Sequence, residues 1–272
     1  MKTLYISDLD GTLLDATPKT SEYTNSVIKN LHENDIVFSF ATARSYTTAK
    51  KVTQGLSMKY PAVVHNGTFI VDKYGTIIRK NTFEKADSNF IIDTLLSCGL
   101  NPIVYSLING REQFSFIRSK LNDETLAFLS TREDDPRKRE IHHTDNLYDG
   151  EVYYFTLIGD EDKTEKLYEK LKDRFQCYFQ RDFYSGDYWL EILPNGATKA
   201  NAVKQLASML DCEKIVAFGD GINDVEMFSI ADECYAVENA VDVLKSKATG
   251  IIKKHTDNGV AKWLSNNLRL NP

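Results

Sequence analysis

The chain has 272 residues, enough for one large domain or two ordinary ones, and 42% of them are hydrophobic and 26% charged. Its 33 basic and 39 acidic side chains leave a formal net charge of −6, which argues against a dedicated surface for nucleic acid or an anionic membrane. No apolar run approaches the roughly 20 residues that span a bilayer, and four dispersed cysteines are too few for a disulfide framework. We therefore expect a globular, cytoplasmic protein, and the sequence leaves its oligomeric state open.

The N-terminal part alternates apolar strands with amphipathic helices. Such alternation indicates βαβ units and a parallel sheet with helices on both faces. The expected strands are 3–7, 36–42 and 62–65, the expected helices are 20–34 and 45–56, and a hairpin follows over 69–79 with its turn from Asp72 to Gly75.

A second unit is expected from about residue 82, where the order of elements changes. It contains predicted helices over 83–99, 120–131 and 161–175, strands over 102–108, 112–118 and 152–160, and a strand and turn over 177–186. The charged run 131–140 is expected to be a solvated loop.

The first pattern returns after a strand-like run at 188–194. Helices are predicted over 198–210, 223–231 and 257–268, and strands over 214–220 and 233–237. The prediction is an α/β fold with a doubly wound, Rossmann-like parallel-sheet core made of residues 1–82 and 187–272. An inserted α/β domain over 83–186 interrupts this core.

Two aspartates follow the first strand, in the stretch YISDLDGTLL. A single acid after a strand is usually a helix cap or a turn former, but Asp8 and Asp10 lie two residues apart and project to the same side. Two neighbouring carboxylates repel each other unless a cation or a proton lies between them. Ligands bind beyond the carboxyl ends of parallel strands, where Asp220 also lies, so the sequence predicts an oxygen-ligated Mg²⁺.

Four short motifs in order carry a family resemblance. The segments D-L-D-G-T-L, A-T-A-R, G-A-T-K-A and G-D-G-I-N-D resemble the four motifs of the haloacid dehalogenase superfamily. The inserted domain resembles the substrate-selecting cap of its Cof-type (type IIB) phosphatases. The resemblance covers the whole chain and implies a Mg²⁺-dependent phosphatase. Such an enzyme hydrolyses a small phosphorylated metabolite, most often a sugar phosphate, through an aspartyl-phosphate.

The resemblance also implies a role for individual residues. Asp8 is the expected nucleophile, and Asp10 protonates the leaving group and later activates water. Mg²⁺ is expected on the Asp8 carboxylate, the Asp10 carbonyl and Asp220, and Asn223 and Asp224 are expected to complete its shell through waters or to orient the phosphate. The residues expected to bind phosphate or substrate are Leu9, Thr42, Ala43, Arg44, Asn66, Lys199 and Asn223, of which Thr42 and Lys199 also count as catalytic.

Structural explanations compete at several of these positions. Asp224 by itself could equally be a helix cap, Arg44 could belong to a surface ion pair, and Asn66 could cap a turn. Lysines at helix starts are usually solvated, so only the resemblance selects Lys199. The pair His142-His143 is expected in a solvated loop rather than on a metal.

Two other functions remain open at this point. A sugar phosphomutase shares the fold and both aspartates, and it needs cap arginines that hold the substrate in two orientations. A phospho-acceptor module also places an aspartate after a strand, but Asp10 argues against it because a nearby acid/base shortens the life of the phospho-form.

Overall fold

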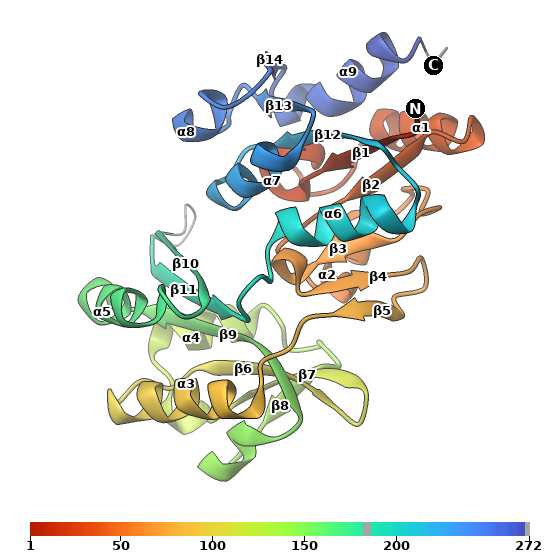
Figure 1. The fold of residues 1–272 in the computed structure, drawn as a ribbon. Helices are drawn as coiled ribbons and strands as arrows, with labels where there is room; N and C mark the ends of the chain where they lie inside the picture. The colour runs from red at the N-terminus through yellow and green to blue at the C-terminus, as the bar shows by residue number, and fades with distance from the viewer. Residues whose placement is uncertain (182–185, 270–272) are drawn as a thin grey trace. The chain divides into compact units, whose positions relative to one another are not determined.

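Parallel strands in the order β14-β13-β12-β1-β2 form the main sheet of the computed structural model, which describes residues 1–181 and 186–269 (Figure 1). β1 lies at the switch in strand order, since the chain passes from β1 to β2 on one side and from β12 to β13 and β14 on the other. Leu4 and Ile6 of β1 project from the same face of the sheet and are both fully buried, whereas Tyr5 on the other face is half-buried. The strands are β1 (Thr3–Ser7), β2 (Val37–Phe40), β12 (Lys214–Gly219), β13 (Glu233–Val237) and β14 (Gly250–Ile252).

Helices cover both faces of this sheet. Because crossover connections are right-handed, the reversal of strand order places α1 and α7 on opposite faces. α1 packs against α9, and α6 packs against α7. Trp263 of α9 contacts the rings of Tyr235 and Phe218, at centroid distances of 4.4 and 5.1 Å. The helices are α1 (Glu22–Glu33), α2 (Tyr46–Val52), α6 (Lys199–Met209), α7 (Val225–Ile230), α8 (Asp242–Lys245) and α9 (Gly259–Asn267). The predicted doubly wound α/β core is confirmed.

The third predicted strand pairs differently from the expectation. β3 (Ala62–Val64), β4 (Phe69–Val71) and β5 (Ile77–Lys80) form a separate antiparallel sheet. Within the described residues, β3 is joined to the chain beyond β2 by one parallel bridge, Ala41 to Val63. The chain reverses directly after β3, so β4 pairs with it immediately. The predicted hairpin is confirmed, with its turn closed from the Gly75 amide to the Asp72 carbonyl at 3.0 Å.

A second sheet, in the order β10-β11-β9-β6-β7-β8, belongs to the inserted part of the chain. The chain divides into one unit of Met1–Lys80 and Ala197–Pro272, the core unit, and another of Asn81–Gly196, the inserted unit. The inserted unit contains β6 (Ile103–Ile108), β7 (Arg111–Phe116), β8 (Lys138–Glu140), β9 (Glu151–Gly159), β10 (Gln176–Arg181), β11 (Tyr188–Leu193), α3 (Lys85–Ser97), α4 (Asp123–Ser130) and α5 (Glu161–Leu171). We expected the core to resume at residue 187, but β11 belongs to the inserted unit because it pairs with β9 and β10. The turn expected after residue 181 lies outside the described residues.

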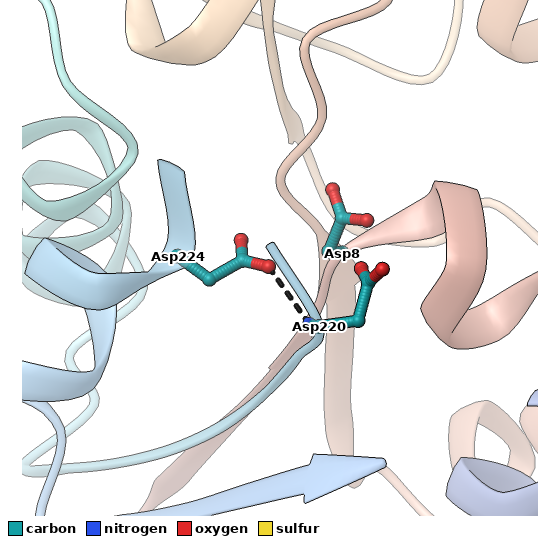
Figure 2. Close-up of side chains that lie close together, drawn as sticks. All are labelled: Asp8, Asp220 and Asp224. Atoms are coloured by element: carbon teal, nitrogen blue, oxygen red, sulfur yellow. Dashed lines mark hydrogen bonds between the residues drawn. The ribbon is translucent and has the colours of Figure 1, made fainter. Parts of the chain in front are cut away.

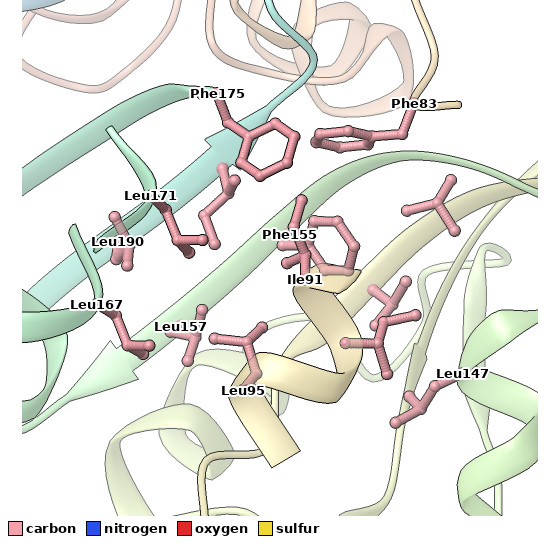
Figure 3. Close-up of a cluster of buried hydrophobic side chains, with 14 of the residues drawn as sticks. Phe83, Ile91, Leu95, Leu147, Phe155, Leu157, Leu167, Leu171, Phe175 and Leu190 are labelled. Carbon is pink, nitrogen blue, oxygen red and sulfur yellow. The ribbon is translucent and has the colours of Figure 1, made fainter. Parts of the chain in front are cut away.

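The inserted unit has its own hydrophobic core (Figure 3). Leu95 of α3 and Leu171 of α5 pack onto the sheet together with Phe155 of β9, and all three are fully buried. Phe83 contacts Phe155 and Phe175 at ring-centroid distances of 5.4 and 5.8 Å. A separate cluster gathers Leu129 of α4 with Phe114 and Phe116 of β7. This unit therefore holds its shape through apolar contacts of its own.

The charged run 131–140 is not the solvated loop that we expected. Its last residues form β8, which pairs in parallel with β7. Asp135 and Arg137 are buried, and the Arg137 guanidinium donates to both Asp135 oxygens at 2.9 and 2.6 Å. Because each charge meets a partner, the pair tolerates burial that an isolated charge would not.

His142 and His143 are exposed. Among the described helices, none is long and apolar enough to cross a membrane.

Candidate active site

Three aspartates meet at the carboxyl ends of β1 and β12 (Figure 2). The two strands pair in parallel, and the Asp8 amide continues the ladder by donating to the Phe218 carbonyl at 2.9 Å. Asp8 follows β1, Asp220 follows β12, and Asp224 ends the short helix η5 (Ile222–Asp224). One oxygen from each carboxylate lies within 4.8 Å of the others, and the described residues contain no other such group of His, Cys, Asp or Glu. The expectation that these strand ends converge agrees with this geometry.

Lys199 bridges two of the three aspartates, Asp8 and Asp224, and is completely buried. It begins α6, where the Thr198 hydroxyl caps the helix by accepting from the Asn201 amide at 3.1 Å. Its ammonium donates to Asp8 Oδ1 at 2.5 Å and to Asp224 Oδ1 at 2.8 Å. Burial disfavours its charge, but the carboxylates of Asp224 and Asp8 outweigh burial and raise the pKa of Lys199. Lys199 is therefore not solvated, unlike most lysines at the start of a helix.

Asp224 is held by protein donors on both carboxylate oxygens. Its Oδ2 accepts from the Asp220 and Gly221 amides, each at 3.0 Å, while Oδ1 accepts from Lys199. A Cβ on Gly219 would lie 2.7 Å from this carboxyl group, so the strand end has room only for glycine. Asp224 thereby ties the loop after β12 to Lys199, which leaves Asp8 and Asp220 as the carboxylates better placed to meet a cation.

The cluster carries an excess of negative charge in a confined space. Burial raises the pKa of Asp8 well above its usual range, although the Lys199 ammonium opposes this. Burial and the charge of Asp224 raise the pKa of Asp220 to about 7, against the effect of a hydrogen bond from Thr12. Three carboxylates facing one ammonium favour an added cation, and carboxylate oxygens are the ligands that Mg²⁺ prefers. The residues present therefore fit the expected metal.

Asp10 and Arg44 form an ion pair at the open side of the site. The Arg44 guanidinium donates from Nε and Nη2 to the two oxygens of Asp10, both at 2.6 Å, and the Asp10 side chain is 50% exposed. Thr42 is fully buried, and its hydroxyl accepts from the Arg44 amide at 3.1 Å. The side chain of Leu9 is buried and Ala43 is exposed. The Asp10 carboxylate is therefore half exposed while both of its oxygens are bound by Arg44.

The segment after β3 connects three parts of the site. Asn66 is buried with φ of +53°, donates from its amide to the Thr42 carbonyl at 2.9 Å, and accepts from the Asn223 side chain at 3.0 Å. Gly67 follows with φ of +98°, and a Cβ there would lie 2.1 Å from the Thr198 carbonyl oxygen. His65 is also left-handed, with φ of +50°, and such backbone at two successive non-glycine residues is strained and persists where its surroundings hold it. Asn66 therefore positions Thr42 and Asn223, which goes beyond the turn cap weighed from the sequence.

Comparison with known proteins identifies the family. A model described as haloacid dehalogenase-like hydrolase matches residues 5–264. The chain belongs to this family.

Relatives and solved structures of the haloacid dehalogenase-like hydrolases agree with that assignment. The chain is 28% identical to a Bacillus subtilis protein named 5-amino-6-(5-phospho-D-ribitylamino)uracil phosphatase, over 97% of each chain. It is 25% identical to the HMP-PP phosphatase of Serratia proteamaculans, over 90% of this chain and 87% of the relative. The fold matches TM0651 from Thermotoga maritima with a TM-score of 0.81 and 23% identity, over 98% and 97% of the two chains. The expected superfamily and enzyme class, a phosphoric monoester hydrolase, are confirmed.

Two further residues of this haloacid dehalogenase-like hydrolase make contacts that the sequence did not predict. The Thr12 hydroxyl could bond locally within its own turn, but it donates to Asp220 Oδ1 at 2.8 Å. Asn239 donates from its side chain to the Gly11 carbonyl at 2.8 Å, across 228 positions of sequence. No spacing rule connects residues so far apart, so only the folded chain reveals these contacts.

Proposed function

We propose that this chain is a Mg²⁺-dependent phosphatase that hydrolyses a small phosphorylated metabolite, of the sugar-phosphate class, through an aspartyl-phosphate on Asp8. The observation that carries the proposal is the buried Lys199 ammonium between Asp8 and Asp224, with Asp220 beside them. A buried carboxylate next to a fixed cation is arranged to accept a phosphoryl group, whose charge then needs stabilising.

The first chemical step forms a bond between Asp8 and phosphorus and breaks the ester bond to the leaving alkoxide. Lys199 holds Oδ1 of Asp8 and so orients the carboxylate. The carboxyl group of Asp10 gives its proton to the leaving oxygen. In the second step Asp10 takes a proton from water as that water attacks phosphorus, which releases inorganic phosphate and restores Asp8. Because Arg44 donates to both oxygens of Asp10, both proton transfers require Arg44 to release Asp10 or to move with it.

The remaining polar residues stabilise the transferring phosphoryl group in this proposal. Thr42 and Lys199 bind its oxygens, and Arg44, Asn66 and Asn223 contact the phosphate or the substrate. Mg²⁺ bound by Asp8, Asp220 and the Asp10 carbonyl, with Asp224 held behind them, would neutralise charge on the phosphoryl oxygens. The exposed position of the Asp10–Arg44 pair supports an anionic ligand entering from this side.

The substrate class rests on the family and on its named relatives. One relative is named for a substrate with a phosphorylated ribityl chain, and another for HMP-PP. We further propose that the inserted unit, Asn81–Gly196, selects the substrate as a cap, since it enters the chain between the segments that carry Asn66 and Lys199. A cytoplasmic location remains part of this proposal.

Phosphate release from a panel of sugar phosphates, nucleotides and cofactor phosphates, with Mg²⁺ or with EDTA, tests the function. We expect Mg²⁺-dependent release that Asp8→Asn and Asp10→Asn each abolish while circular dichroism shows an intact fold. Turnover by folded Asp8→Asn would refute the mechanism. A change of phosphate position on the sugar without release of phosphate would instead identify a phosphomutase.

A further inference from the structure

The turn after β13 holds both loops that carry the acidic cluster. The Asn239 side chain donates to the Gly11 carbonyl at 2.8 Å, and the Val241 amide donates to the Asp220 carbonyl at 2.9 Å. The turn is itself anchored, because the Ala240 amide donates to the Val237 carbonyl at 2.9 Å. One short segment thus contacts the loop after β1 and the loop after β12.

Asn239 has a second partner that determines which side chain suits this position. Its Oδ1 accepts from the His255 amide at 3.1 Å. The Gly11 carbonyl can only accept and the His255 amide can only donate, so the side chain must offer one donor and one acceptor. A carboxamide does this, a carboxylate of the same shape offers acceptors alone, and a methyl group offers neither.

The position of Gly11 decides where the Asp220 carboxylate can lie. Gly11 has φ of +73°, and a Cβ there would lie 2.3 Å from Asp220 Oδ2, so backbone and carboxylate are packed directly together. The neighbouring Thr12 hydroxyl donates to Asp220 Oδ1 at 2.8 Å. A displacement of the turn η1 (Leu9–Leu13) therefore moves or releases Asp220.

We propose that Asn239 is a positioning residue for the metal site. By holding the Gly11 carbonyl it keeps η1 packed on Asp220 and so keeps Asp220 aligned with Asp8 for a divalent cation. Groups that orient metal ligands without touching the metal commonly change metal affinity by 10- to 100-fold when they are removed. The inference rests on the Mg²⁺ requirement in the proposed function.

Mg²⁺ titration of the phosphate-free protein by calorimetry, combined with amide hydrogen exchange of the metal-free protein, tests this role. We expect Asn239→Ala to weaken Mg²⁺ affinity about tenfold. We also expect faster exchange at the Leu14 amide, which donates to the Leu9 carbonyl at 2.9 Å and so reports on η1. Asn122→Ala is the matched control, because Asn122 also bridges a carbonyl, Ile158, and an amide, Thr125, but in the inserted unit. It should change neither quantity.

Asn239→Asp separates the two partners of Asn239 and is assessed by exchange, because its added charge would itself attract Mg²⁺. It keeps the acceptor for His255 and loses the donor to Gly11, so we expect the Leu14 amide to exchange as fast as in Asn239→Ala. Protection of Leu14 retained in Asn239→Asp, or Mg²⁺ affinity of Asn239→Ala within about twofold of wild type, would overturn the inference. Failure of the wild-type protein to bind Mg²⁺ would show separately, before any variant is compared, and would refute the metal requirement itself.

Discussion

Replacing Lys199 by methionine tests the central interaction of the site. The side chain keeps nearly its length, but Asp8 and Asp224 lose the ammonium that lies 2.5 and 2.8 Å from them. Removing one partner of a buried ion pair leaves uncompensated buried charge and costs about 3–5 kcal/mol. At roughly 3 °C per kcal/mol for a domain of this size, the melting temperature of the core unit should fall by about 10 °C at pH 8.

The loss should depend on pH in a defined direction. Without Lys199, the charge of Asp224 acts on Asp8 unopposed and raises the pKa of Asp8 further above its usual value. A carboxyl group whose pKa is raised in the folded state contributes stability that is present at low pH and lost as the pH rises through the folded pKa. The destabilisation by Lys199→Met should therefore be smaller at pH 5.5 than at pH 8.

Differential scanning calorimetry in EDTA at both pH values measures the stability, and phosphate release with Mg²⁺ measures the activity. We expect kcat to fall by about 10²–10³-fold or more, since a fixed charge that stabilises the transition state is lost. Added Mg²⁺ should recover part of the melting temperature but not kcat. The control is Lys204→Met, an exposed lysine on the same helix. If Lys199→Met matches this control in stability at both pH values, the buried ion pairs do not act as we describe.

Three further predictions concern other parts of the site. Gly67→Ala should lower the free energy of unfolding by about 2 kcal/mol or more in chemical denaturation, because its Cβ would lie 2.1 Å from the Thr198 carbonyl oxygen. Gly110 also has positive φ but nothing within 4 Å, so Gly110→Ala measures the backbone cost alone. Equal losses in the two variants would contradict the steric argument. Mg²⁺ affinity and Mg²⁺-induced stabilisation should both rise between pH 6 and 8, because the metal must displace the proton of Asp220, whose pKa is about 7. The contribution of protonated Asp220 to the stability of the metal-free protein is lost as the pH rises through that pKa. Calorimetry that finds no pH dependence would exclude Asp220 as a ligand. Arg44→Ala should cost less than about 1 kcal/mol in stability, since its ion pair is partly exposed, yet should raise KM more than Arg44→Lys does; an unchanged KM would remove Arg44 from the substrate site.

Much of the fold was readable from the sequence because its signals are local. Apolar runs and helical spacing located most strands and helices of the core, and the doubly wound order followed from their alternation. β8 and β14 were missed because β8 consists of three charged residues, Lys138–Glu140, and β14 has only two apolar residues after Gly250. The predicted boundary at residue 187 placed β11 with the core rather than with its partners β9 and β10, since a strand's partners depend on which edges are available after folding rather than on its own residues.

The candidate site, like the fold, could be predicted from the sequence only in part. The pair Asp8 and Asp10 and the motif around Asp220 are contiguous in sequence, so their chemistry could be predicted directly, and the family resemblance added Lys199. What the tertiary structure decided is how these groups meet: Lys199 becomes a buried counterion, Thr12 turns to Asp220, and Asn239 reaches Gly11. The physical reason is range, because a motif depends on neighbours along the chain whereas burial and long-distance hydrogen bonds exist only once separate segments pack together.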